Sequence, residues 1–249
     1  MLIHEFGNME APVVVLIPGT YASWQIFSPL IGLLQADWRI VVPALDGQQT
    51  DLDGKPVPNE FTTVDDEARQ IEEYLLAHAC GKADTVYGIS LGGSIGVRLA
   101  ERNKVQIRRL VMDAAPITSF SGAMRVFSQY YQALNVWCCC HFGKLYRKIF
   151  RSHYFHALFD EFDRTFPCDG SRTAIRVFRS VFSSRLQSLP DGIKAEFWHG
   201  SKELLFPPQA RHAVAVYPAT KVTVFPKMNH AQLLTDHPEE IAGRIEQDR

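Results

Sequence analysis

Short runs of aliphatic and aromatic residues recur along the chain, and each has the length and composition of a β-strand. Most of these runs are continuous and do not alternate with polar residues, so they predict parallel strands buried on both faces of a sheet. The predicted strands lie at 13–17, 39–42, 85–87, 109–112, 195–198 and 221–225.

Amphipathic segments with helical spacing lie between these strands. Segment 64–79 repeats apolar residues at helical spacing, and Thr63 before it is a suitable N-cap residue. Further helices are predicted at 91–102, 207–216 and 238–247, the last two opened by proline in the first turn. Alternating strands and helices predict the α/β class, with a doubly wound, mostly parallel sheet flanked by helices.

The alternation stops between residues 118 and 190, where no strand is predicted and aromatic residues are frequent. A crossover between neighbouring strands needs far less chain than this. We therefore expect a core made of residues 1–117 and 191–249, with residues 118–190 inserted as a mostly helical cap. The carboxyl ends of the strands are where doubly wound sheets bind ligands, and the cap is expected to cover them.

The predicted cap is positively charged. It holds ten Lys and Arg residues and four Asp and Glu residues, so it carries about +6 while the rest of the chain carries about −7. This charge suits an anionic or carrier-linked substrate, and the aromatic residues suit an apolar acyl group. A solvated cap whose aromatic side chains pack internally accounts for the same residues.

Composition excludes some classes of function. A net charge of −1 argues against a nucleic-acid partner and against a membrane-surface role. The N-terminal segment lacks the features of a signal peptide, and no apolar run approaches the roughly 20 residues of a membrane span. Cys138, Cys139 and Cys140 are adjacent, which suits neither disulfides with one another nor a zinc site. We expect a cytoplasmic protein with reduced cysteines, no metal and no other cofactor.

One short motif indicates chemistry. Residues 88–92 read GISLG, with Ser90 between two glycines, directly after a predicted strand and before a predicted helix. A sharp strand-to-helix turn of this kind raises a serine hydroxyl above the edge of the sheet, where it can act as a nucleophile. In this arrangement the sequence resembles the α/β-hydrolase family, and the resemblance extends over nearly the whole chain outside the cap.

The resemblance implies a histidine and an acid as partners of Ser90. The family places its histidine after the last strand, where His230 lies, whereas His199 and His237 fit that position less well. The usual acid follows an earlier strand in the pattern G-x-x-D. Here Glu203 stands three residues after a glycine, and glutamate is a known variant. Asp113, one strand earlier, is the alternative acid.

The resemblance also implies an oxyanion hole made by two backbone N–H groups. One belongs to the residue after the nucleophile, Leu91, and the other to the loop after the first predicted strand, at Thr20. Many relatives have His-Gly in that loop, whereas this chain has Pro18 and Gly19.

These residues predict a serine hydrolase that cleaves a carboxylic ester or thioester of a small-molecule acyl substrate through an acyl-enzyme. Haloalkane and epoxide opening in this family use an aspartate nucleophile, which Ser90 disfavours. The alternatives are a catalytically inactive protein of the same fold that binds a ligand, and a hydrolase of C–C or amide bonds.

Overall fold

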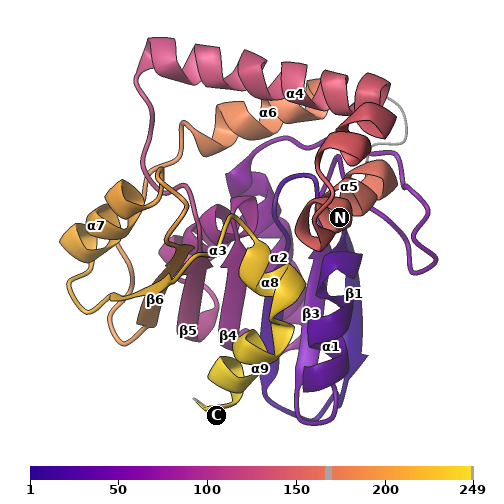
Figure 1. Cartoon of the computed structure of the whole chain (residues 1–249). Coiled ribbons are helices and arrows are strands. Elements are labelled where there is room, and N and C mark those ends of the chain that lie inside the picture. Colours follow the sequence, from indigo (N-terminus) through magenta and orange to yellow (C-terminus); the bar gives the residue numbers. More distant parts are fainter. Residues whose placement is uncertain (166–169, 248–249) are drawn as a thin grey trace.

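The computed structural model describes residues 1–165 and 170–247. Within them, seven strands form one sheet in the order β1-β3-β2-β4-β5-β6-β7 (Figure 1). Neighbouring strands are parallel except at one edge, where β1 runs antiparallel to β3. The strands are β1 (Leu2–Gly7), β2 (Val13–Ile17), β3 (Arg39–Ala44), β4 (Lys82–Ile89), β5 (Gln106–Asp113), β6 (Lys194–Gly200) and β7 (Lys221–Phe225).

Helices cover both faces of this sheet. The helices of the core are η1 (Trp24–Phe27, a 3₁₀-helix), α1 (Ser28–Leu34), α2 (Val64–His78), α3 (Leu91–Arg102), α7 (Pro207–Val216), α8 (Gln232–Asp236) and α9 (Pro238–Glu246). Alternate side chains of β2 point to opposite faces: Val15 belongs to the hydrophobic cluster that includes residues of α2, α3 and α7, and Leu16 to the cluster that includes residues of α1, α8 and α9. The central strands are therefore buried on both sides, as the sequence predicts.

Most predicted elements are confirmed. All six predicted strands and all four predicted helices of the core are present, and the Thr63 hydroxyl caps α2 by accepting the Asp66 N–H at 3.0 Å. The prediction of burial on both faces is wrong for β7, because this strand is at the sheet edge and Val222 and Val224 are exposed. The sequence reading missed β1, η1, α1 and α8.

Three helices are inserted between β5 and β6, all inside the segment where a cap is predicted. They are α4 (Gly122–Ile149), α5 (His153–Thr165) and α6 (Ser171–Val181). Figure 1 shows α4 and α6 crossing above the carboxyl ends of the strands, with α5 beside the end of α4. Helix α4 is interrupted at Phe142, whose φ and ψ are −120° and 17°. Within residues 1–165 and 170–247, no helix combines the length and hydropathy needed to cross a bilayer.

Candidate active site

Ser90 occupies a strained turn between β4 and α3. Its φ and ψ are 54° and −118°, a backbone conformation that costs a non-glycine residue about 1–3 kcal/mol. The Ser90 N–H donates to the carbonyl of Asp113 on β5 at 2.7 Å, which fixes the turn against the neighbouring strand. The turn therefore lies above the carboxyl ends of β4 and β5, beneath the inserted helices.

The two glycines of the motif allow the backbone to pass closely at this turn. A Cβ atom on Gly92 would lie 2.1 Å from the carbonyl oxygen of Ile17, and one on Gly88 would lie 2.3 Å from the carbonyl oxygen of Gly92. Neither distance leaves room for any side chain. The sequence pattern around Ser90 is therefore a steric requirement of the turn.

His230 and Glu203 are brought together from two loops. The imidazole Nδ1 of His230, between β7 and α8, lies 2.7 Å from the Glu203 carboxylate, which follows β6. The other oxygen of this carboxylate accepts the N–H of Gly200, and Glu203 is buried. The Phe206 ring stacks on the imidazole with centroids 5.4 Å apart, and the Tyr154 hydroxyl of α5 donates to the His230 carbonyl at 2.6 Å. The imidazole is thus oriented by Glu203 and Phe206, while Tyr154 holds the backbone of His230.

Asp113, the alternative acid, lies at the end of β5 and has a different hydrogen-bond partner. Its carboxylate accepts the hydroxyl of the buried Tyr87 at 2.5 Å, and it forms no hydrogen bond with His230 in the part of the chain that the structure describes. Burial raises the pKa of Asp113 to about 7, against the opposing effect of the Tyr87 hydrogen bond. Of the two candidate acids, only Glu203 is hydrogen bonded to the histidine.

The loop that carries Thr20 is held by a residue that the sequence reading missed. The amide of buried Gln48 donates to the carbonyls of Gly19 (2.6 Å) and Ala22 (2.9 Å), and it accepts the N–H of Tyr21 at 3.1 Å. Tyr21 has a φ of 69°, so this loop is in an uncommon backbone conformation. Gln48 lies shortly after a predicted strand, at the ligand-binding end of the sheet. This position is the feature of the sequence that could have identified it.

The other predicted oxyanion donor, Leu91, is the first residue of α3. The N–H groups in the first turn of a helix have no acceptor within that helix, which is the condition that an oxyanion donor must meet.

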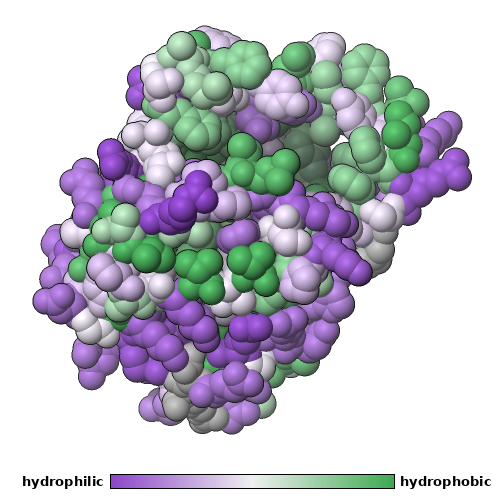
Figure 2. Space-filling model, turned by 60° about the vertical axis from the view of Figure 1, so that its left-hand side comes forward, coloured by the Kyte–Doolittle hydropathy of each residue, from purple (hydrophilic) through white to green (hydrophobic). Residues whose placement is uncertain are grey.

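Two cavities meet at Ser90. Thr20, Tyr21, Ser90 and His230 line both of them. Figure 2 shows the molecule hollowed beneath its upper part, with hydrophobic residues around the hollow. The enclosed cavity, of about 230 Å³, is also lined by Ile26, Ile89, Cys139, Leu158, Phe159 and Phe162. The more open cavity, of about 520 Å³, is also lined by Pro116, Gln132, Tyr154, Phe155, Phe178, Phe182, Lys202, Leu204, Leu205, Phe206 and Asn229.

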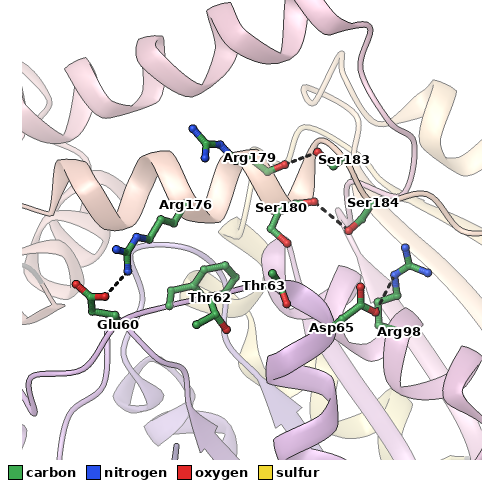
Figure 3. Close-up of a pocket in the computed structure, with 11 residues that line it drawn as sticks. Glu60, Thr62, Thr63, Asp65, Arg98, Arg176, Arg179, Ser180, Ser183 and Ser184 are labelled. Atoms are coloured by element: carbon green, nitrogen blue, oxygen red, sulfur yellow. Dashed lines mark hydrogen bonds and ion pairs between the residues drawn. The ribbon is translucent and has the colours of Figure 1, made fainter.

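A third cavity, of about 660 Å³, lies between α6 and the core helices α2 and α3 (Figure 3). Arg98, Arg176 and Arg179 line it, and two of them are paired with carboxylates: Arg176 lies 2.6 Å from Glu60, and Arg98 lies 3.6 Å from Asp65. Neither Ser90 nor His230 lines this cavity. The candidate active site is therefore the pair of smaller cavities, although the third is larger.

Known proteins match the chain over almost all of its length. Similar solved structures include a protein from Desulfitobacterium hafniense assigned to the alpha/beta hydrolase family (TM-score 0.80, 18% identity, 99% of each chain). Others are a carboxylesterase structure from Nitrososphaera gargenis (TM-score 0.74, 17% identity, 99% of this chain and 92% of that one) and a thermophilic esterase from Thermogutta terrifontis (TM-score 0.74, 15% identity, 99% and 91%). At these identities the likeness is one of fold. Comparison with curated protein sequences finds no match.

Family membership rests on the sequence as well as on the fold. The model of the alpha/beta hydrolase family matches residues 14–244. This range includes the sheet strands before and after the inserted helices, except β1, together with the inserted helices, Ser90 and His230. The chain belongs to the alpha/beta hydrolase family.

Proposed function

We propose that the protein is a serine hydrolase that cleaves carboxylic esters or thioesters, with Ser90 as nucleophile, His230 as base and Glu203 as acid. The observation that carries the proposal is the 2.7 Å hydrogen bond between His230 Nδ1 and Glu203, made by a histidine that lines the same cavities as Ser90. This bond places a proton on Nδ1 and leaves Nε2 free to accept the serine proton.

The reaction has two halves. In the first, Ser90 Oγ attacks the carbonyl carbon as His230 takes its proton, and His230 then returns that proton to the departing alcohol or thiol. In the second, His230 removes a proton from water, which attacks the acyl-enzyme carbonyl, and His230 returns that proton to Ser90 Oγ as the ester bond breaks and the acid leaves. In both halves the negative oxygen is bound by the N–H groups of Thr20 and Leu91, and loss of one such donor costs about 3 kcal/mol.

The two cavities suggest where the two parts of the substrate, on either side of the scissile bond, lie around Ser90. The enclosed cavity is lined largely by apolar side chains, such as Ile26 and Phe162, and we assign it to the acyl group. The open cavity includes polar residues, such as Lys202 and Asn229, and we assign it to the alcohol or thiol part. An alcohol and a thiol leave by the same steps, so the proposal covers both carboxylic esters and thioesters.

A panel of esters and thioesters with varied acyl length tests this function. Wild type is expected to hydrolyse members of the panel and to react stoichiometrically with a fluorophosphonate. Ser90→Ala is expected to lose both properties, with activity lower by about 10³-fold or more. Ser94→Ala, four residues later in α3, is the matched control and is expected to keep both. A protein that binds panel members without turnover, and does not react with the probe, would instead be a ligand-binding member of the family.

A further inference from the structure

Helix α4 carries an apolar stripe on its exposed face. Its members follow one another at steps of three or four residues within 124–134 and again within 142–149, the spacing that places side chains on one face of a helix. They are 48–66% exposed, although all are large hydrophobic residues. The α4 stripe consists of Met124, Phe127, Tyr131, Leu134, Phe142, Leu145 and Ile149.

The α4 stripe is separate from the face with which α4 packs on the protein. The buried residues of this helix are Gln129, Ala133 and Val136, and α6 is its main neighbour. An ordinary surface helix has one apolar face toward the core and a polar face toward water. In α4 the second face is apolar as well, so internal packing of the cap does not account for these residues.

The charges beside the α4 stripe are positive. The 28 residues of α4 include no Asp or Glu, and Lys144 and Lys148 are exposed one turn apart near its end, followed by exposed Arg151. The net charge of −1 led us to expect no membrane-surface role. It is, however, the sum of a cap near +6 and a core near −7. The overall charge thus hides a positively charged surface.

The α4 stripe lies beside the mouth of the open cavity. Gln132 of α4 lines this cavity together with Leu204 and Leu205, which are 85% and 73% exposed. Figure 2 shows hydrophobic residues across the top of the molecule, where α4 lies in Figure 1, and around the hollow below. Helix α4 therefore contributes both to the exposed apolar surface and to the lining of the cavity that reaches Ser90.

We propose that the α4 stripe docks the protein on the surface of an anionic lipid bilayer. An amphipathic helix with aromatic and aliphatic residues on one face and basic residues beside it is the form that lies in a membrane interface. Anionic lipid complements the positive cap, whereas two copies meeting through α4 would bring two positive caps together. The inference does not depend on the proposed chemistry.

Co-sedimentation with vesicles tests the docking, using Ser90→Ala protein so that no lipid ester is cleaved. Binding is expected to vesicles of phosphatidylcholine with phosphatidylglycerol and to be weaker by about tenfold or more with phosphatidylcholine alone. The double variant Phe127→Ser, Leu134→Ser is expected to lose at least about tenfold in affinity. The matched control replaces Val222 and Val224, exposed on β7, by serine and is expected to bind as before.

Two further measurements complete the test. Lys144→Gln with Lys148→Gln is expected to weaken binding to anionic vesicles by about fivefold per charge removed. Circular dichroism and thermal unfolding establish that each variant is folded. Absence of vesicle binding, or equal binding to both vesicle types, overturns the proposal. A dimer seen by sedimentation velocity and abolished by the stripe substitutions, without vesicle binding, assigns the α4 stripe to a second copy of the chain.

Discussion

At the scale of single residues, two carboxylates near the candidate site have different surroundings. Glu203 accepts hydrogen bonds from His230 and from the Gly200 N–H. Asp113 is buried beside Tyr87, and burial raises its pKa to about 7. A triad acid must be ionised to stabilise the imidazolium, so Glu203 suits that role better than Asp113.

This difference predicts unequal effects of two conservative substitutions. Glu203→Gln is expected to lower kcat by about 10³–10⁴-fold, because an amide neither selects the correct tautomer nor stabilises a charged imidazole. Asp113→Asn keeps an oxygen that can accept the Tyr87 hydroxyl and is expected to change kcat by less than about tenfold. Steady-state kinetics on one ester measures both. A severe effect of Asp113→Asn beside a mild effect of Glu203→Gln would assign the acid to Asp113.

Asp113 also predicts how stability varies with pH. Its pKa is about 7 in the folded protein and near 4 in an unfolded chain, so the folded state binds more protons between these values. The stability that this carboxyl contributes is full below about pH 4 and is lost as the pH rises through about 7. Relative to Asp113→Asn, the free energy of unfolding of wild type is expected to fall by up to about 1.4 kcal/mol per pH unit in this window.

Urea denaturation of wild type and Asp113→Asn at several pH values measures this difference. Because the two proteins share every other titrating group, their difference isolates Asp113. A difference that stays constant from pH 4 to pH 8 would contradict the raised pKa of about 7.

At the scale of elements, the turn and the loop that meet at the site are fixed in different ways. The turn at Ser90 is set by steric fit, since Gly88 and Gly92 leave no room for a Cβ atom. The loop at Thr20 is set by hydrogen bonds, since Gln48 binds three backbone groups within residues 19–22. The steric requirement at Ser90 appears in the sequence as a glycine motif. The hydrogen bonds at the Thr20 loop depend on a single glutamine, which forms no recognisable motif.

The role of this loop predicts an effect of Gln48→Leu on turnover. Leucine fills similar space but makes none of the three hydrogen bonds, so the Thr20 N–H is expected to lose its fixed position. Since an oxyanion donor acts mainly in the transition state, kcat is expected to fall by about 10–100-fold with little change in KM.

Gln49→Leu is the matched control for this loop. Gln49 is equally buried, but its amide donates to the Ala44 carbonyl instead of to the loop. It is expected to lose stability and to keep kcat, and an equal loss of kcat in both variants would reject a specific role for Gln48.

At the scale of the whole molecule, the inserted helices shape the site that the core positions. Helices α4 and α5 contribute Cys139, Leu158, Phe159 and Phe162 to the enclosed cavity, and the core contributes Ser90. The core therefore positions Ser90, and the cap closes part of the space beside it together with core residues such as Ile26 and Ile89. The buried Glu161 of α5 joins the two parts by accepting the N–H and the hydroxyl of Ser23, at 3.0 and 2.6 Å.

This division predicts that Phe159→Ala changes acyl selectivity. Removing the ring enlarges the enclosed cavity, so the preferred acyl chain is expected to become longer and kcat/KM for a long-chain ester is expected to rise by about tenfold relative to a short-chain one. Phe155→Ala, in the open cavity, is the control and is expected to leave the acyl preference unchanged. A shift in acyl preference with Phe155→Ala alone would reverse the assignment of the two cavities. Kinetics on a homologous series of esters measures both.

The α/β fold, six of the seven strands and the turn at Ser90 were predictable from the amino-acid sequence alone. Continuous hydrophobic runs and a glycine pair at a close approach are local features, so they can be read without the rest of the molecule. Strand β1 escaped that reading because it is a half-buried edge strand, stabilised by its pairing with β3. The same reading ranked Glu203 above Asp113 from spacing but left both possible.

Three features became visible only in the folded molecule: which carboxylate contacts His230, how Gln48 holds the Thr20 loop, and the outward orientation of the apolar residues of α4. Each of these depends on the distance between residues that are far apart along the chain, and such distances follow from packing. The charge of the cap was readable in the sequence, but its combination with an exposed apolar face was not, because spacing defines the faces of a helix without saying which face is covered.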